Sequence, residues 1–151
     1  MLKDVGMNEV TVRNVGSGDL PRCATVYVEA FAEPPYNEEW SLEDAEAMLE
    51  VYLRRDPTLC FCAEMGGEVV GIAFCSAVSI YRATIEELAV LPRVQGMGIG
   101  RALLDRCLEE LRSRGHRDVT LVVDANAPAY AFYRRHGFRP TRRHVLMVRE
   151  L

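Results

Sequence analysis

The chain has 151 residues, of which 49% are hydrophobic and 26% charged, and its net charge is −4. This matches one ordinary globular domain, so we expect a single domain over residues 1–151 and exclude a disordered chain or a collagen-like repeat. No apolar run approaches the roughly 20 residues of a membrane-spanning helix, and residues 1–4 lack the pattern of a secretory signal. The five scattered cysteines form no C-x-x-C pair, and there are only three histidines. We therefore expect a cytoplasmic protein with neither a membrane partner nor a bound metal.

Charge is unevenly distributed along the chain. Residues 1–75 contain 14 acidic and 5 basic side chains, whereas residues 76–151 contain 8 acidic and 13 basic ones. Residues 23–53 carry eight carboxylates and no basic side chain. This run is either a solvated face or an acidic rim that attracts a cationic substrate, while the basic half would suit an anionic ligand. No nucleic-acid partner is expected, because the whole chain is acidic and no basic stripe is interleaved with aromatic residues.

Hydrophobic periodicity predicts ten elements in the order βααβββαβαβ. The predicted strands cover residues 9–15, 59–65, 68–79, 84–91, 117–123 and 144–149. The predicted helices run from Asp19 to Phe31, from Ser41 to Asp56, over 98–114 and over 127–136. Gly66 and Gly67 are typical of a two-residue hairpin turn. The order indicates a mixed α/β or α+β fold, with one sheet covered by helices.

A glycine-rich loop follows the predicted strand 84–91 and opens the helix 98–114. Bare backbone N–H groups at a helix N-terminus favour a phosphate or diphosphate, and we expect a side chain at Gly98 or Gly100 to obstruct its approach. A P-loop needs Gly-Lys-Ser/Thr, but Gly100 is followed by Arg101-Ala102, and a dinucleotide motif needs a small residue where Arg101 stands. The pattern that is met is Gln-Gly-x-Gly-x-Gly at residues 95–100, after Ala-Val-Leu-Pro at residues 89–92.

A second block, Asn-Ala-Pro-Ala-Tyr-Ala-Phe-Tyr-Arg-Arg-His-Gly-Phe, occupies residues 126–138. With both blocks in this order, the sequence resembles the GNAT superfamily of N-acetyltransferases. The resemblance implies an α/β single domain with a curved mixed sheet of six to seven strands and about four helices. It also implies that the fourth strand (84–91) and the fifth (117–123) splay apart to admit acetyl-CoA, the expected co-substrate.

The resemblance assigns the cofactor contacts residue by residue. The diphosphate is expected on the glycine loop and its flanks: Gln95, Gly96, Met97, Gly98, Ile99, Gly100 and Arg101. The thioester oxygen is expected to meet the backbone of Leu88, Ala89 and Val90. Asn126 is expected to bond the pantetheine arm, although it also fits an ordinary helix N-cap, and both roles can hold together.

Two kinds of proton transfer are needed, and the sequence offers candidates for each. The resemblance implies that Tyr133 donates a proton to the departing thiolate; the alternative is a tyrosine packed under the sheet. For the base we favour Glu86, acting through water, because strict alternation puts it on the face of Thr84 and Leu88. Glu87 is the alternative, since a bulge would reverse the facing.

The resemblance also implies that residues 31–40 wall the acceptor site. Phe31, Tyr36, Glu38 and Trp40 are the expected substrate contacts, because aromatic rings and carboxylates suit a cation. We expect direct transfer to a primary amine of a cationic small molecule or peptide, rather than a route through an acetylated cysteine. A non-catalytic acyl-CoA-binding module and, more distantly, a dinucleotide-dependent enzyme remain the alternatives. A monomer and a homodimer are both compatible with the sequence.

Overall fold

A computed structural model describes residues 9–151, which divide into two compact units. The first unit ends at Leu121 and the second comprises Val122–Leu151. The stretch 1–4, from which we expected no secretory signal, lies outside the described residues. Within the part that is described, none of the helices has the length and apolar character needed to cross a membrane.

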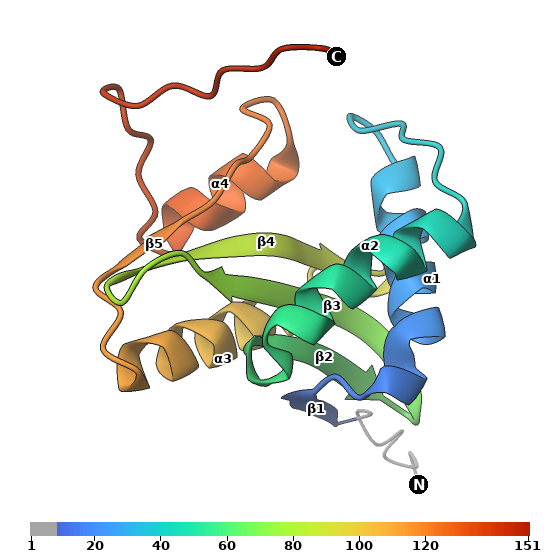
Figure 1. The fold of residues 1–151 in the computed structure, drawn as a ribbon. Helices are drawn as coiled ribbons and strands as arrows, with labels where there is room; N and C mark the ends of the chain where they lie inside the picture. Colours follow the sequence, from blue (N-terminus) through green and yellow to red (C-terminus); the bar gives the residue numbers. More distant parts are fainter. Residues whose placement is uncertain (1–8) are drawn as a thin grey trace, which may run out of the picture. The chain divides into compact units, whose positions relative to one another are not determined.

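The first unit is built on a five-stranded mixed sheet (Figure 1). Its strands are β1 (Val10–Asn14), β2 (Cys60–Met65), β3 (Glu68–Ala77), β4 (Arg82–Val90) and β5 (Asp118–Thr120), and they lie in that order. The first four are antiparallel, and β5 is parallel to β4. Gly66 and Gly67 form the β2–β3 turn with φ values of 60° and 78°, as their sequence predicts. The α/β prediction is confirmed, with fewer strands than the six or seven expected.

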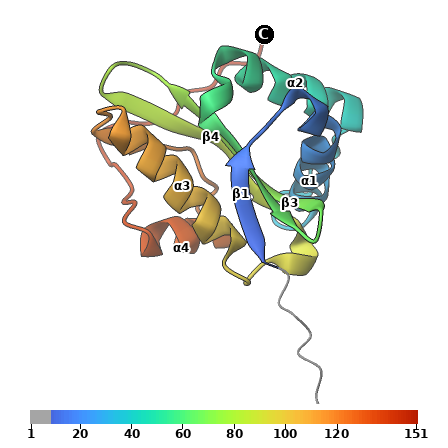
Figure 2. The ribbon, with the colours of Figure 1, turned by 90° about the horizontal axis from the view of Figure 1, so that it is seen from below.

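Helices cover both faces of this sheet (Figure 2). On one face lie α1 (Leu20–Ala32) and α2 (Leu42–Arg55), and on the other lies α3 (Ile99–Ser113). Gly71 of β3 allows α3 to approach closely, because a Cβ there would lie 2.8 Å from Leu103 and 3.0 Å from Ile99. The close approach of α3 fixes where its N-terminus lies relative to β4.

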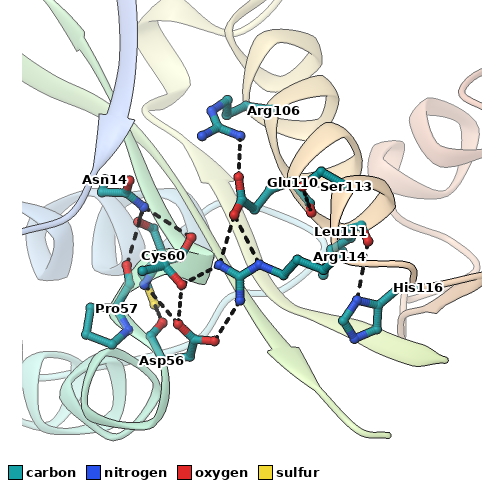
Figure 3. Close-up of polar contacts among 11 residues, drawn as sticks. Asn14, Asp56, Pro57, Cys60, Arg106, Glu110, Leu111, Ser113, Arg114 and His116 are labelled. Atoms are coloured by element: carbon teal, nitrogen blue, oxygen red, sulfur yellow. Dashed lines mark hydrogen bonds and ion pairs between the residues drawn. The ribbon is translucent and has the colours of Figure 1, made fainter. Parts of the chain in front are cut away.

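Short 3₁₀ turns join these elements: η1 (Ser17–Asp19), η2 (Pro57–Leu59) and η3 (Pro92–Val94). A polar cluster ties the C-terminal end of α3 to η2 (Figure 3). Arg114 Nη1 donates to Asp56 Oδ2 at 3.0 Å, and Arg114 Nε donates to Glu110 Oε1 at 3.0 Å. Arg106 Nη1 also donates to Glu110, at 3.1 Å. The C-terminal end of α3 is thereby tied to the segment between α2 and β2.

The second unit contains one helix, α4 (Pro128–Arg135), which satisfies the helix predicted over 127–136. The strand predicted over 144–149 is wrong: these residues form no regular element, and Val145–Val148 are 71–86% exposed. Likewise, the strand predicted over 117–123 is only three residues long. Alternating apolar residues describe a side-chain pattern, but a strand also needs a hydrogen-bonding neighbour, which the pattern does not specify.

Candidate active site

The outer edge of β4 is open over most of its length. β5 pairs with β4 only at residues 82–84, and the hydroxyl of Thr84 donates to the carbonyl of Thr120 at 3.0 Å where the pairing ends. Beyond this point, residues 85–90 of β4 have no strand on that side among the described residues. The β4–β5 pairing therefore ends at Thr84, where the predicted splaying would begin.

Backbone direction along the open edge follows from two hydrogen bonds. Leu91 N–H donates to the carbonyl of Val70 in β3, whereas the carbonyl of Val90 accepts from Gln95 Nε2 at 3.0 Å. Because successive residues of a strand point their backbone groups to opposite edges, Leu88 and Val90 face the open edge. Ala89 belongs to the ladder with β3, opposite Ile72. Of the three residues expected to contact a thioester oxygen, two are thus oriented for it.

The N-terminus of α3 presents backbone donors next to this edge. Gly98 is the N-cap with φ 84°. Because glycine has no side chain, no side-chain hydrogen bond caps the helix. The first bond of the helix runs from Ala102 N–H to the Gly98 carbonyl, so the N–H groups of residues 98–101 have no partner among the described residues. Gly96 and Gly98 both have φ near +80°, which non-glycine residues rarely adopt. This left-handed backbone, more than the space around the two residues, explains why glycine stands there, since a Cβ at either position would have nothing within 4 Å.

The side chains of the loop divide between the core and the surface. Ile99 is 1% exposed and anchors the loop, while Met97 is 61% exposed. Arg101 is exposed and lies 3.7 Å from Asp105 one turn along α3. The N–H groups at the start of α3 give this end of the helix a positive polarity, as expected for an anion site, while Asp105 offsets part of the charge of Arg101.

A bulge in β4 changes the facing expected for the two carboxylates. Phe74 of β3 is opposite Glu87 and Cys75 is opposite Ile85, so Glu86 is the extra residue. Glu86 was expected on the face of Thr84 and Leu88 because side chains alternate between the two faces of a regular strand. The bulge interrupts this alternation, so the expected facing of Glu86 is wrong. Both carboxylates turn toward α1 and α2: Glu86 Oε1 lies 3.8 Å from Arg55 Nη1, and the charge of Glu87 acts on Tyr27 and Tyr52.

The environments of the two carboxylates differ. Glu87 is half-buried, and burial, followed by the charges of Glu86 and Glu38, raises its pKa to about 8. Glu86 is paired with a cation and is 27% exposed at its side chain. A carboxyl group whose pKa is raised thus lies next to a carboxylate that is paired with a cation, an arrangement typical of acid–base sites.

An aromatic cluster stands over this region on α1 and the segment after it. Tyr27 stacks on Phe31 at 4.5 Å between ring centroids and meets Trp40 edge-on at 5.4 Å, and Phe31 meets Tyr36 at 4.9 Å. Trp40 Nε1 donates to Glu38 Oε2 at 2.6 Å. The four expected acceptor contacts (Phe31, Tyr36, Glu38 and Trp40) are therefore brought together.

Sequence reasoning missed three residues of this region. Tyr27 joins the aromatic cluster to Glu87, and its pKa is raised by burial and then by Glu87 and Glu38. Tyr52 and Arg55 lie one turn apart at the end of α2 and face the bulge of β4. The helical spacing of Tyr52 and Arg55 is visible in the sequence, but it is equally typical of residues that only pack against the sheet. Only the position of α2 on the sheet distinguishes the two roles.

Asn126 and Tyr133 belong to the second unit. Asn126 N–H donates to Asp124 Oδ1 at 2.8 Å, and the N-cap of α4 is Ala127, so the N-cap role considered for Asn126 is wrong. The ring of Tyr133 contacts Phe132 and Phe138 at 5.3 and 5.4 Å between centroids. Their expected contacts with acetyl-CoA bound at β4 stay predictions.

The cysteines are all free and buried. Burial raises the pKa of the Cys23 and Cys60 thiols to about 12 and that of Cys62 to about 11, and the neighbouring Cys107 thiol raises that of Cys75. A buried, protonated thiol is a poor nucleophile. Among the described residues, no group of three or more His, Cys, Asp or Glu side chains could hold a metal.

Comparison with known proteins decides the family. The model of the acetyltransferase (GNAT) family matches residues 25–138, a stretch that spans both units. The chain belongs to this family. The GNAT resemblance inferred from the two sequence blocks is thereby confirmed.

Individual GNAT relatives differ in what they acetylate. A mycothiol acetyltransferase from Thermomonospora curvata is 35% identical over 85% of this chain and 44% of its own length. The [ribosomal protein bS18]-alanine N-acetyltransferase of Escherichia coli is 30% identical over 85% of this chain and 80% of its own. The chain spans less than half the length of the mycothiol acetyltransferases it matches.

A solved structure of a GNAT acetyltransferase from Brucella melitensis in complex with acetyl-CoA shares the fold. Its TM-score is 0.71 at 28% identity, and the match covers 88% of this chain and 84% of that protein.

Proposed function

We propose that this chain is an acetyl-CoA-dependent N-acetyltransferase acting on a primary amine of a cationic small molecule or peptide. The observation that carries this proposal is Glu87, a carboxyl group beside the open edge of β4 whose pKa is raised to about 8. An aliphatic amine is a cation at neutral pH and must lose a proton before it can attack. A general base works best when its pKa is close to the working pH.

The N-terminus of α3 fits the diphosphate of acetyl-CoA. Within the part of the chain that the structure describes, the N–H groups of residues 98–101 have no hydrogen-bond partner, and Gly96 and Gly98 have positive φ. When bound, acetyl-CoA supplies an acetyl group activated as a thioester. Arg101 adds positive charge at the same place, and Asn126 is the residue proposed to bond the pantetheine arm.

Glu87, rather than Glu86, is the proposed base. Both carboxylates face α1 and α2, but Glu86 is engaged by Arg55, whereas the raised pKa of Glu87 suits it to take up a proton near neutral pH. The ionised Glu87 accepts the first proton of the acceptor ammonium and passes it to solvent. The bulge turns both carboxylates toward the same helices, and the pairing of Glu86 with Arg55 together with the raised pKa of Glu87 is the reason for preferring Glu87.

Leu88 and Val90 then orient their N–H groups toward the place where negative charge develops on the acyl oxygen. The carbon–nitrogen bond forms and the carbon–sulfur bond breaks. Tyr133 donates its hydroxyl proton to the departing sulfur and recovers one as the new amide nitrogen loses its second proton. One ammonium and one thioester give one amide, one thiol and one released proton, so the atoms and charges balance.

The aromatic cluster and Glu38 provide the acceptor site. Ring faces and a carboxylate attract a cation through complementary charge and cation–π contact. The hydrogen bond that Trp40 donates orients the Glu38 carboxylate and occupies only one of its acceptor positions. A cationic acceptor is therefore favoured over a neutral or acidic one.

Release of free CoA across a panel of acceptors tests the proposal. We expect release with diamines, aminosugars or peptides with a free amino terminus, and none with acidic acceptors. Binding of acetyl-CoA without release for every amine would instead support the non-catalytic acyl-CoA-binding module. Preference for acidic acceptors would contradict the assignment of the acceptor site.

A further inference from the structure

Arg55 occupies a position that connects α2, β3 and the bulge of β4. It is the last residue of α2, and its Nη1 lies 3.2 Å from the hydroxyl of Ser76 and 3.8 Å from Glu86 Oε1. Ser76 is 2% exposed, so one partner of the guanidinium is fixed in the sheet. The bulge turns Glu86 out of the ladder and toward Arg55. A rigid hydroxyl and a bulged carboxylate thus hold the same guanidinium nitrogen.

We propose that Arg55 is a positioning residue that neutralises Glu86 and thereby leaves Glu87 as the carboxylate that takes the proton of the acceptor. This inference rests on the proposed function, because it concerns the base of that reaction. Without Arg55, two adjacent negative charges would face the incoming ammonium. With Arg55 in place, one of the two is already paired and the other is available.

The groups around Glu87 determine the direction of the effect. They are Glu86 on β4 itself, Tyr27 on α1, Tyr52 and Arg55 on α2, and Glu38 on the segment between the helices. The negative charges of Glu86 and Glu38 raise the pKa of Glu87, and Arg55 is the cation that lies 3.8 Å from the first of them. Removing Arg55 should raise the pKa of Glu87 further, and removing Glu86 should lower it.

The test is the pH dependence of kcat/KM for Arg55→Gln, Glu86→Gln and the double variant. For Arg55→Gln we expect the midpoint of the acidic limb to rise by about half a pH unit, as for one charge removed at a partly exposed site. For Glu86→Gln we expect it to fall. In the double variant the Arg55→Gln effect should largely disappear. An unmoved midpoint in Arg55→Gln would overturn the proposal, since a merely structural arginine would change rates but not the midpoint.

Arg54→Gln is the matched control. Arg54 lies next to Arg55 on α2, is 77% exposed, and pairs with Glu50 at 2.9 Å on the outer side of the helix. Its removal should leave the midpoint unchanged, and an equal shift in Arg54→Gln would contradict a specific role for Arg55. Arg55→Lys retains the charge and should restore the midpoint, which keeps the test valid if Arg55→Gln folds poorly.

A carbon-13 NMR titration of the Glu87 carboxyl, assigned by its loss in Glu87→Gln, separates this inference from the proposed function. If no amine is acetylated but the titration midpoint rises in Arg55→Gln, the charge pairing stands and the proposed reaction fails. If acetyl transfer occurs and neither midpoint moves, the reaction stands and the role of Arg55 fails.

Discussion

The loop before α3 and the segment between α1 and α2, the two proposed recognition regions, present different parts of the chain. The loop offers backbone N–H groups and glycines at positive φ, with its one large buried side chain, Ile99, turned into the core. The α1–α2 segment offers side chains: the rings of Tyr36 and Trp40, next to Phe31 at the end of α1, and a carboxylate that accepts a hydrogen bond from Trp40. Backbone recognition requires only that glycines stand at given places, whereas side-chain recognition can change with every substitution. We therefore expect the first to recur among GNAT relatives and the second to differ between relatives with different acceptors.

The sharpest test of the side-chain region is Glu87→Gln. We expect kcat to fall by about 10²–10⁴-fold, the usual contribution of a positioned base, with little change in acetyl-CoA affinity. In the wild type, kcat/KM should rise with pH along a limb centred near 8, because the ionised carboxylate is the active form. That limb should vanish in the variant. The rate of CoA release, measured at pH values from 6 to 9, reports both effects. Glu109→Gln on the exposed side of α3 is the matched control.

Tyr133→Phe tests the proton donor placed in the second unit. We expect kcat to fall by about 10²-fold, with the dissociation constant of acetyl-CoA nearly unchanged, because the hydroxyl acts on the departing sulfur. Calorimetry and steady-state kinetics report the two quantities separately. Tyr81→Phe removes the hydroxyl of a tyrosine that is 50% exposed and should be silent. Unchanged turnover in Tyr133→Phe would remove this residue as the acid.

Gly98→Ala tests the backbone region. A residue with φ near +84° is strained when it carries a Cβ, so the N–H groups at the start of α3 should lose their alignment. We expect acetyl-CoA to bind about tenfold more weakly, measured by calorimetry. Gly115→Ala places the same change at φ 85° beyond the other end of α3. It should lower the melting temperature to a similar extent and leave the affinity intact; equal loss of affinity in both would refute a specific role for Gly98.

Glu38→Gln should have the smallest effect. We expect KM for a cationic amine to rise several-fold at low ionic strength and by less at high salt, because an exposed charge is screened. The neighbouring Glu39→Gln should change KM little. If the two variants behave alike, the acidic run acts as a general field and not through Glu38.

The sequence predicted the backbone region better than the side-chain region. The glycines and the helix start followed from local patterns, because turn chemistry and periodicity are local. The open edge of β4 was expected only from the resemblance to the GNAT superfamily. The base did not follow from a local pattern. Glu86 and Glu87 are adjacent, and which of them faces a given partner depends on a bulge set by pairing with β3. The roles of Tyr27 and Arg55 depend on how α1 and α2 pack on the sheet, and the absent last strand depends on a neighbour that the pattern does not supply.

The bond from Gln95 to the carbonyl of Val90 has a consequence beyond cofactor recognition. An unpaired strand edge invites another polypeptide to add itself, which is a common route to aggregation. By occupying an acceptor at the end of that edge, the glutamine side chain interrupts the row of free groups on which a foreign strand would dock. The hydrogen bond between Gln95 and Val90, next to the glycine loop, thus also helps to prevent another polypeptide from pairing with the open edge of β4.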